Sequence, residues 1–344
     1  NVQVHQWDNV INAENADIEG FSVRAEKAVI DDIACLIYTS GTGGLPKGVM
    51  LHHGSIMHNA AGASGVIESL GLNNNVFLSF LPLSHAYEHT VGQCWPLAIG
   101  AQIWYAESIE KLAGNMEESK PTVMVVVPRL FEMLRTRISR GVEKEGGTKA
   151  KLFKRCLELG MKRQRDKQKL NLFEKAEDLF LTVTVRRKVQ KQFGGRMKAL
   201  VSGGAPLSPD VGYFFSSLGL PLLQGYGQTE AGPVISVNPP AAPRMQTVGK
   251  PFDGVGVKIA EDGEILIQGD LVMKGYWQDE KATSKTLIDG WLHTGDIGVL
   301  DEDGYLEITD RKKDLIVNDK GDNVSPQRIE GLLALENEIA QAMV

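Results

Sequence analysis

In the first two-thirds of the chain, short apolar runs are separated by longer segments with the spacing of an amphipathic helix. The runs cover residues 76–81, 122–127, 198–201 and 220–223, and residues 129–138 have the helical spacing. This alternation is typical of an α/β domain with a largely parallel sheet. Ligands of such sheets gather at the carboxyl ends of the strands, so we expect the chemistry in the loops that follow the runs.

The last third of the chain has a different pattern. Short strand-like segments at residues 256–259, 264–268 and 305–309 are separated by three Asp-Gly pairs, at 262–263, 289–290 and 303–304. Asp-Gly is favoured in the tight turns that join antiparallel strands, because these turns require positive φ angles. We therefore expect a hairpin-rich β subdomain from about residue 245 to residue 312.

Residues 137–198 form a basic segment with a helical pattern and no strand-like run before its end. They hold nineteen Lys and Arg against seven Asp and Glu, an excess of twelve positive charges. One interpretation is a solvated helical hairpin, and the other is a patch that contacts an anionic lipid surface or an acidic partner. In the second case the apolar face would be formed by Leu152, Phe153, Leu157, Leu170, Leu172 and Phe173.

Length, charge and cysteine content narrow the class of protein. A chain of 344 residues suggests two or three structural units, and a net charge of −6 argues against a nucleic-acid partner. Three widely spaced cysteines exclude a disulfide framework and are typical of a reducing compartment. With no run of about 18 apolar residues we expect no transmembrane helix. The expected location is cytoplasmic, with the basic segment reaching the inner face of a membrane if it binds lipid.

Residues 38–49 read YTSGTGGLPKGV and follow an apolar run at 33–37. Glycines let backbone N–H groups point at an anion, while the hydroxyl groups and Lys47 add donors and a positive charge, so this segment predicts a phosphate-binding loop. It is not a Walker A loop, because the lysine has a proline before it and a glycine after it. It is not a dinucleotide fingerprint either, since Pro46 takes the position of the last glycine. An ordinary surface turn is the alternative.

Four more segments carry polar residues in distinctive order. They are QGYGQTE at 224–230, WLHTGDIG at 291–298, DRKKDLIV at 310–317 and LPLSHAYEH at 81–89. Taken singly, each is compatible with a turn or a charged face. Together, the segments resemble the adenylate-forming superfamily, which includes acyl- and aryl-CoA synthetases, luciferases and the adenylation domains of peptide synthetases. Residues 81–89, the basic insert and the double lysine that follows Arg311 resemble the long-chain fatty-acyl-CoA synthetases within it.

This resemblance implies an AMP-forming acid–thiol ligase with a large α/β adenylation domain. A fatty acid would attack the α-phosphate of ATP, with Mg²⁺ bound, to give acyl-AMP and pyrophosphate. The thiol of CoA would then displace AMP. Such chemistry depends on positioning and charge neutralisation and needs no covalent enzyme intermediate. The small-molecule partners would thus be fatty acid, ATP and CoA, while the oligomeric state stays open.

The resemblance also assigns the phosphate-binding residues. Glu230 would hold Mg²⁺, a cation that prefers oxygen ligands, with Thr39 in the same coordination shell. Thr229 would hydrogen-bond the α-phosphate. Expected catalytic residues are Lys47, His85, Thr229 and Glu230. The residues that would wrap the β- and γ-phosphates are Thr39, Ser40, Gly41, Thr42, Gly43, Gly44 and Lys47.

A second group of residues would bind the nucleoside. Asp296 would accept hydrogen bonds from the ribose hydroxyls, and Arg311 would reach the ribose or a phosphate. Each assignment also has a purely structural alternative. Tyr226 would be a core aromatic, Glu230 would be a charge at a helix N-terminus, and Lys312 and Lys313 would be surface lysines without a function. Residues expected around the adenine ring are Gly204, Ala205, Pro206, Gln224, Gly225, Tyr226 and Gly227.

On the acyl side, His85 would lie near the substrate carboxylate, and Gly204 would also bind the acyl group. His89 would gate the passage between the ATP site and an acyl tunnel, although a core or surface histidine is the alternative for both. A cluster of three histidines after the glycine-rich loop reads as helix-start and surface residues and not as metal ligands, because no Cys or carboxylate completes a site. This cluster is His52, His53 and His58.

The chain departs from the family pattern in two ways. Gly43 stands where a second threonine is usual, so we expect looser phosphate binding. We also expect a fragment, with residues 1–312 as a large domain incomplete at its N-terminus. Residues 313–344 would then be a hinge at Lys313 and the start of a truncated small α+β domain, without the lysine that contacts the acyl carboxylate. A ligase for medium-chain or aryl acids and a non-catalytic nucleotide- or acyl-binding fragment remain the alternative functions.

Overall fold

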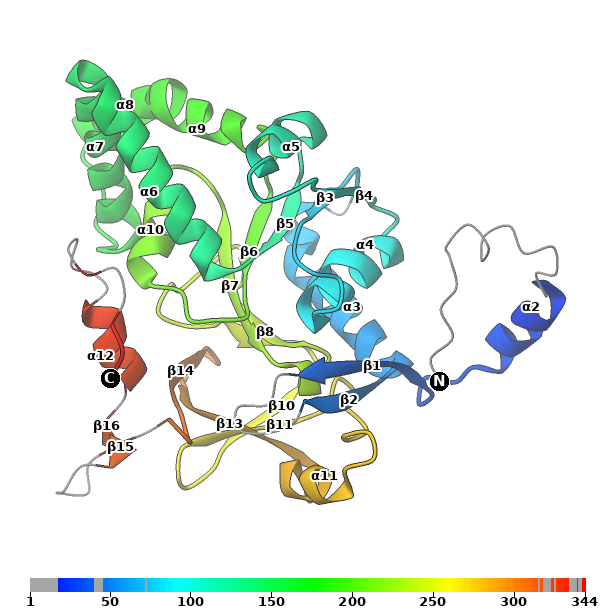
Figure 1. Ribbon diagram of the computed structural model, residues 1–344. Coiled ribbons are helices and arrows are strands. Elements are labelled where there is room, and N and C mark those ends of the chain that lie inside the picture. Colours follow the sequence, from blue (N-terminus) through cyan, green and yellow to red (C-terminus); the bar gives the residue numbers. More distant parts are fainter. Residues whose placement is uncertain are drawn as a thin grey trace.

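The computed structural model describes residues 18–39, 46–71, 73–314, 316–317, 323–324, 326–333, 339 and 342–344. Its largest sheet has seven strands in the order β4-β3-β5-β6-β7-β8-β9 (Figure 1). The first five strands in this order are parallel, and the last two are antiparallel. The expected α/β fold with a largely parallel sheet is therefore confirmed. The strands are β3 (Val76–Ser79), β4 (Gln102–Tyr105), β5 (Val123–Val126), β6 (Ala199–Ser202), β7 (Leu222–Gly227), β8 (Val234–Val237) and β9 (Lys250–Pro251).

All four apolar runs of the sequence form parallel strands of this sheet, namely β3, β5, β6 and β7. Strand β4 was not predicted. It lies at the edge of the sheet, where Trp104 and Tyr105 are exposed, so it lacks the continuous apolar run of a strand that is covered on both faces.

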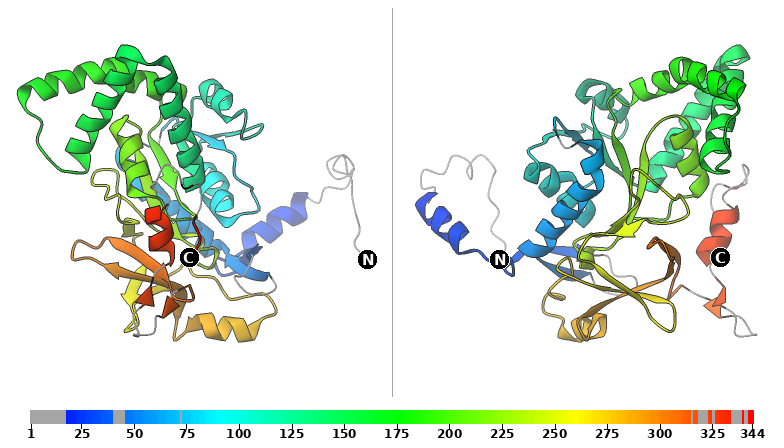
Figure 2. Two further views of the ribbon diagram at one scale, coloured as in Figure 1. Left: turned by 60° about the vertical axis from the view of Figure 1, so that its left-hand side comes forward. Right: turned by 180° about the vertical axis from the view of Figure 1, so that it is seen from behind.

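Helices cover both faces of the sheet, and the alternation of side chains along β5 shows how. Met124 and Val126 enter the hydrophobic cluster beneath α6 (Pro128–Glu145), α7 (Gly147–Gln164) and α10 (Pro209–Ser217). Val123 and Val125 enter the cluster beneath α3 (His53–Ile67) and α4 (Trp95–Ala98). Successive residues of a strand point to opposite faces, so a continuous apolar run is what a doubly covered strand requires. Figure 2 shows α3 and α10 on opposite sides of the strands.

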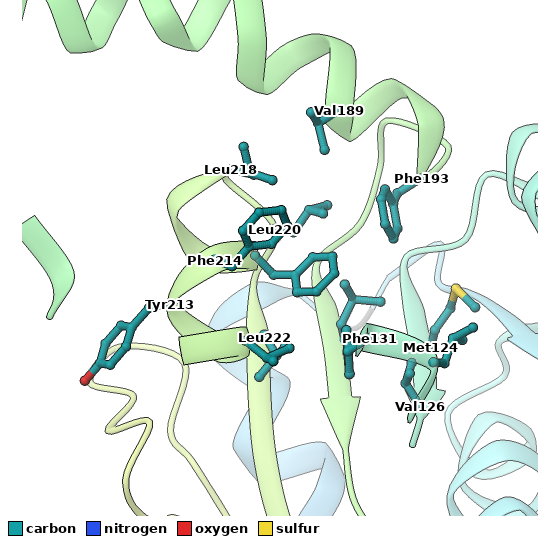
Figure 3. Packing of buried hydrophobic residues seen from close by; sticks show 14 of the residues in the cluster. Met124, Val126, Phe131, Val189, Phe193, Tyr213, Phe214, Leu218, Leu220 and Leu222 are labelled. Atoms are coloured by element: carbon teal, nitrogen blue, oxygen red, sulfur yellow. The ribbon is translucent and has the colours of Figure 1, made fainter. Parts of the chain in front are cut away.

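The cluster beneath α6 and α10 is rich in aromatic side chains (Figure 3). Phe131 and Phe215 are fully buried, and their ring centroids lie 5.1 Å apart in an edge-to-face arrangement. Phe193 packs edge-on against Phe215 as well. Edge-to-face packing of this kind stabilises the core beyond the area it buries, and here it joins α10 to α6 and to the end of α9.

The basic segment is helical, as expected. After α7 it continues in α8 (Leu172–Leu181), a π-helical stretch, η3 (Thr182–Arg186), and α9 (Arg187–Gln192). Asn171 caps α8, since its side chain accepts a hydrogen bond from the amide of Glu174 while the Glu174 side chain binds the amide of Asn171. Cys156 and Leu159 of α7 are fully buried, so this helix is part of the core and not a free arm.

The prediction that six residues of this segment form a free apolar face is wrong for four of them. Phe153 is buried, and Leu152, Leu157 and Leu170 pack against the main core. Leu172 and Phe173 are exposed, because α8 turns its first residues away from α7. The helical spacing of the sequence shows that an apolar face exists but does not tell which side of the helix meets the core.

A second sheet is antiparallel and has β11 (Glu264–Gln268) and β13 (Trp291–Leu300) at its centre. It also contains β10 (Gly256–Ile259), β12 (Leu287–Ile288) and β14 (Leu306–Arg311). This confirms the hairpin-rich pattern of the last third. Strand β13 was not predicted, although it carries the WLHTGDIG motif, because its glycines and polar residues hide the alternation of a strand.

The glycine-rich segment does not follow a strand of the parallel sheet. It joins β1 (Ile33–Thr39) to β2 (Lys47–His52) in an antiparallel hairpin. The hairpin packs on the antiparallel sheet, where Val49 and Leu51 share a buried cluster with Ile265. The expectation that this loop lies at the carboxyl end of a parallel strand is therefore wrong, because an apolar run of this length fits a hairpin equally well.

The remaining described elements are short. None of the helices in these described ranges combines the length and apolar character that crossing a bilayer would require. The remaining short elements are α2 (Ile18–Lys27), η1 (Glu68–Leu70), η2 (Glu88–Cys94), α5 (Leu112–Ser119), η4 (Thr229–Ala231), α11 (Glu280–Thr286), β15 (Ile316–Val317), β16 (Asn323–Val324) and α12 (Pro326–Leu333).

One histidine of the cluster after the glycine-rich loop was misplaced. His52 is buried, with its two ring nitrogens 3.0 Å and 3.2 Å from the carbonyl oxygens of Ile30 and Val272. It therefore ties the start of α3 to the antiparallel part of the molecule and is not a surface residue. His53 is exposed at the start of α3, as expected.

Candidate active site

A cleft of about 1770 Å³ lies where the carboxyl ends of β6 and β7 face the antiparallel sheet. Most of the residues assigned by resemblance line this cleft. Thr39 contributes from the hairpin, Gly204 from the loop after β6, and His85 from the segment before η2. The other assigned residues in its wall are Gly225, Tyr226, Gly227, Thr229, Glu230, Asp296, Arg311 and Lys313.

Some assigned residues do not line the cleft. Lys47 borders a small neighbouring depression with Asp279. Gln224 is buried in the sheet, whereas Ala205 and Pro206 are exposed on the loop just beyond Gly204. His89 is half-buried on η2. Five assigned residues of the glycine-rich loop lie outside the described residues: Ser40, Gly41, Thr42, Gly43 and Gly44.

Glycines at the end of β7 let the chain turn into the cleft. A Cβ atom at Gly227 would lie 1.8 Å from the carbonyl oxygen of Pro233, so a side chain there is incompatible with the pairing of β7 and β8. The turn η4 follows and brings Thr229 and Glu230 to the cleft wall. The amide of Met273 donates a hydrogen bond to the carbonyl oxygen of Glu230 at 2.9 Å, which ties this turn to the segment that follows β11.

Tyr276 connects Glu230 with Lys47. Its buried hydroxyl group donates a hydrogen bond to Oε1 of Glu230 at 2.8 Å, and Nζ of Lys47 lies 4.7 Å from the centre of its ring. Burial, and then the neighbouring carboxylate of Glu230, raise the pKa of Tyr276 above its usual range, so the phenol stays protonated and continues to donate. Sequence reasoning missed Tyr276, because a Gly-Tyr-Trp triplet outside any motif gives no functional signal.

Asp296 lies between a phenol and a guanidinium. The hydroxyl group of Tyr226 donates to Oδ2 at 2.7 Å, and Nε of Arg311 lies 3.1 Å from Oδ1. Strands β13 and β14 set this geometry, because Asp296 and Arg311 face each other across the ladder. Burial raises the pKa of Asp296, and the two donors oppose that change. Burial also raises the pKa of Tyr226 well above its usual value, with Asp296 adding to the effect.

A second buried carboxylate, Glu264, lies close to this pair, and no motif pointed to it. Burial by itself would raise the pKa of Glu264, but Lys312, the amide of Gly295 and His293 together lower it below its usual value. Glu264 begins β11 and also lines the cleft. The only hint in the sequence is its place after an Asp-Gly turn, which any hairpin could share.

The other end of the cleft is apolar. Its wall is supplied by α3, η2, the first residue of α4 and strands β7 and β8, and Nε1 of Trp95 donates a hydrogen bond to Ser64 at 2.9 Å. His85 is exposed, and its Nδ1 accepts a hydrogen bond from the amide of Tyr87 at 3.2 Å. The apolar side chains of this wall are Ala63, Val66, Ile67, Val91, Trp95, Leu223, Val234, Val237 and Phe252.

Behind this wall, η2 buries Glu88. Burial raises the pKa of Glu88 to about 7, and the nearby Ser79 hydroxyl offsets this only partly. Within the described part of the chain neither carboxylate oxygen has a hydrogen-bond partner of good geometry. Gly92, one turn later, leaves the space that the carboxyl occupies, since a Cβ there would lie 2.4 Å from Oε1. Burial also lowers the pKa of His89, the next residue.

Comparisons with known proteins agree with this geometry. The family described as AMP-binding enzyme matches residues 3–277. The long-chain-fatty-acid--CoA ligase FadD15 of Mycobacterium bovis is 36% identical over 315 residues, which cover 91% of this chain and 52% of that protein. The peroxisomal long chain acyl-CoA synthetase 7 of Arabidopsis thaliana is 33% identical over 333 residues, 91% of this chain and 46% of that protein. The chain thus spans about half the length of these relatives.

Solved structures share the fold. ATP-bound MatB from Rhodopseudomonas palustris matches with a TM-score of 0.68 at 25% identity, over 92% of this chain and 55% of that one. The o-succinylbenzoate CoA synthetase of Bacillus subtilis, in complex with its acyl-adenylate, matches with a TM-score of 0.70 at 24% identity, over 92% and 57% of the two chains. The chain belongs to the AMP-binding enzymes of the adenylate-forming superfamily and is long-chain acyl-CoA synthetase-like.

Proposed function

We propose that this protein activates a long-chain fatty acid with ATP, first to acyl-AMP and then to acyl-CoA, with release of pyrophosphate and AMP. The observation that carries the proposal is one continuous cleft with a polar end at Glu230 and Asp296 and an apolar end at Trp95 and Phe252. A nucleotide and a fatty acyl chain need such neighbouring surfaces. The relatives named as long-chain-fatty-acid--CoA ligases support the same substrate class.

At the polar end, the residues present fit a metal-bound triphosphate. Oε1 of Glu230 accepts from Tyr276, and Oε2 has no partner among the residues that the structure describes, which leaves it available to Mg²⁺. Thr39, on the same cleft wall, would supply a hydroxyl ligand. Bound Mg²⁺ would neutralise phosphate charge. Lys47 and Thr229 would hold the phosphates by charge and by a hydrogen bond, together with the loop at residues 40–44.

The nucleoside would lie along β7 and β13. Asp296 would accept the ribose hydroxyl groups with Arg311 beside it, and Tyr226 would lie against the adenine. Gly225 and Gly227 let β7 pack closely on residues 233–237 at the cleft wall, and Gly204, with φ near +82°, would let the loop after β6 turn close to the base. The loop residues Ala205 and Pro206, with Gln224, would complete the adenine site from outside the cleft wall.

The acyl chain would extend along the apolar wall. Each methylene that leaves water contributes about 0.8 kcal/mol, so ten of them outweigh any single polar contact to the carboxylate. His85 at the mouth would lie near the reacting carboxylate, and His89 would act as the gate. Because Trp95 and Phe252 close the wall with large side chains, substitution at these positions is expected to change chain-length preference.

We further propose the domain division expected from the sequence. Residues 1–312 would form the large domain, with the basic insert at 137–198 and the β-rich part from about 245. Residues 313–344 would be the hinge at Lys313 and the start of a small domain that rotates between the two half-reactions, at which point CoA would enter. Lys313 is exposed, as a hinge residue must be to change its backbone angles.

A panel of acids in a pyrophosphate-release assay, run on the full-length protein, tests the substrate class. We expect turnover with acids of palmitate length, and little with aryl acids or short acids. Turnover with aryl acids and none with palmitate would instead favour an aryl-acid ligase, the alternative for which the o-succinylbenzoate enzyme is a structural neighbour. Absence of turnover with every acid, despite tight ATP binding, would favour a nucleotide-binding function.

We also propose that α8 contacts an anionic lipid surface at the inner face of a membrane, and that the protein is otherwise cytoplasmic. The acidic side chains of α8 all point to basic partners: Glu174 to Lys162 at 2.6 Å, Glu177 to Arg155 at 2.9 Å and Asp178 to buried Arg186 at 2.6 Å. Its fully exposed residues are therefore apolar apart from Lys175, and the partly exposed carboxylate of Glu177 is paired with Arg155, which suits an interfacial helix. These exposed residues of α8 are Leu172, Phe173, Lys175, Ala176, Leu179 and Phe180, and Val183 of η3 is exposed as well.

Flotation with vesicles tests this surface. We expect the protein to float with phosphatidylglycerol vesicles at low salt, less with phosphatidylcholine vesicles, and several-fold less when Leu172 and Phe173 are both changed to Ser. The control is Leu97→Ser, which changes another exposed leucine, on α4 and away from α8. Equal binding by the double variant, or no binding to anionic vesicles at all, would contradict the assignment.

A further inference from the structure

Glu264 bridges two segments that the proposed function places around the ribose. Its side chain is only 6% exposed. Oε1 accepts a hydrogen bond from the backbone amide of Gly295 at 2.9 Å, and Oε2 lies 2.9 Å from Nζ of Lys312 and 3.2 Å from Nδ1 of His293. Gly295 directly precedes Asp296, and Lys312 directly follows Arg311.

The same two segments are also joined without Glu264. The amide of Lys312 donates to the carbonyl oxygen of Gly295 at 2.9 Å, and Arg311 pairs with Asp296. Lys312 reaches a second carboxylate, Asp262, at 2.6 Å on the turn before β11. Glu264, at the start of β11, therefore connects Gly295 in β13 with Lys312 just after β14.

An irregular ladder explains why a side chain is needed here. The pairing of β11 with β13 shifts register after Glu264, and that of β13 with β14 shifts between Ile297 and Gly298. Where a ladder is disrupted, backbone groups lose their regular partners. Glu264 supplies an acceptor to the amide of Gly295 at this place. A buried charge is retained only when it is paired and hydrogen-bonded, and Lys312 provides the pairing.

We propose that Glu264 is a positioning residue for nucleotide binding, which holds the Asp296–Arg311 pair in place and tethers Lys312. This inference rests on the proposed function, because it takes Asp296 and Arg311 as the ribose-binding pair. It also implies that rotation of the small domain begins at Lys313 and not earlier, since the backbone up to Lys312 is fixed to the antiparallel sheet.

Calorimetric titration of the full-length protein with ATP, in the absence of acid and CoA, tests the inference. Glu264→Gln removes the carboxylate charge and turns an amide N–H group toward one of the donors, Lys312 or the amide of Gly295. Because the Asp296–Arg311 pair then loses its support, we expect the Kd for ATP to rise about tenfold or more. Lys312→Met, at a half-exposed position, should fold and should weaken ATP binding in the same direction, whereas Lys312→Arg should bind nearly as the wild type does. Fatty-acid KM should stay within about twofold in all three variants, because none of them touches the apolar wall.

Asp301→Asn is the matched control. Asp301 follows β13, pairs with Arg244 at 2.6 Å and accepts from the backbone amides of Asp303 and Tyr305, the same combination of contacts away from the cleft. Loss of the Asp301 charge should lower the melting temperature and leave the Kd for ATP unchanged. An unchanged Kd in both Glu264→Gln and Lys312→Met, or an equal rise in Asp301→Asn, would overturn the inference and leave the proposed function standing. Failure of the wild type to bind ATP would overturn both.

Discussion

The phenol of Tyr276 donates a hydrogen bond to Glu230, with 2.8 Å between the two oxygens, and its ring carries the ammonium group of Lys47 on one face. One buried side chain thus lies between a carboxylate and a cation that would otherwise attract each other. Because the contact uses only Oε1, the proposed function would leave the other oxygen of Glu230 and the ammonium group of Lys47 to a metal-bound triphosphate. This spacing is what the proposed pyrophosphate-releasing reaction would require.

Tyr276→Phe should therefore reduce activity far more than stability. Loss of one hydrogen bond to a charged group costs about 1.5–3 kcal/mol. If the whole cost appears in the stabilisation of the transition state, kcat/KM for ATP falls about ten- to a hundredfold. Steady-state kinetics with ATP varied would measure this drop. The cation–π contact to Lys47 stays in the variant, so a complete loss of activity is not expected.

Tyr213→Phe provides the control for that substitution. Tyr213 is buried and its hydroxyl accepts a hydrogen bond from Gln246 at 2.8 Å, but it lies on α10 and not in the cleft wall. It should lose a similar amount of stability with unchanged kinetics. Equal kinetic effects of the two substitutions would show that the hydrogen bond to Glu230 has no special function.

Asp296→Asn should raise the KM for ATP by about tenfold or more and leave the KM for the fatty acid unchanged. The neutral amide accepts hydrogen bonds from ribose hydroxyl groups less strongly than a carboxylate and no longer pairs with Arg311. Kinetics with each substrate varied in turn would separate the two effects. A rise in the KM of the fatty acid alone would place Asp296 on the acyl side instead.

Glu88 should make the stability of the fold depend on pH. Its pKa is about 7 in the folded protein against 4.5 in an unfolded chain, so its contribution is complete below pH 4.5 and is lost as the pH rises through 7. The upper bound of this loss is about 3 kcal/mol in the free energy of unfolding. Urea denaturation at pH 5.5 and pH 8.5 should show it in the wild type and show a smaller difference in Glu88→Gln. An identical pH dependence in both proteins would contradict this prediction.

Gly43→Thr tests the departure of the glycine-rich loop from the family pattern. A second threonine would add a hydroxyl donor to the phosphates, so the apparent affinity for ATP should increase by a few-fold, as expected for one hydrogen bond. Titration with ATP measures it. If the affinity does not change, a backbone N–H group already supplies the missing donor.

Much of the fold could be predicted from the sequence, because the strands of the parallel sheet are covered on both faces. Val123 to Val126 must all be apolar to be buried in this way, and a run of this kind is easily read. Strands β4 and β13 could not be predicted, since the first is an exposed edge and the second carries the glycines and polar groups of the site. The hairpin of β1 and β2 was misplaced because an apolar run does not reveal which sheet it joins.

The lining of the cleft was predictable where its residues belong to motifs. Glu230, Asp296 and Arg311 do line one cleft. Tyr276 and Glu264 act through contacts between residues 46 and 48 positions apart, to Glu230 and to Lys312, and spacing along the chain does not encode such contacts. The direction of α8 was likewise undetermined, because the choice of which apolar side chains enter the core depends on tertiary packing.

Product analysis of the full-length protein with Mg-ATP, CoA and a fatty acid of palmitate length tests the proposed activity most directly. Chromatography should detect AMP and acyl-CoA in equal amounts, with no ADP, and Glu230→Ala should abolish both products. Formation of ADP, release of AMP without acyl-CoA, or an unchanged yield from Glu230→Ala would contradict an acyl-adenylating ligase that uses Glu230 to hold its metal.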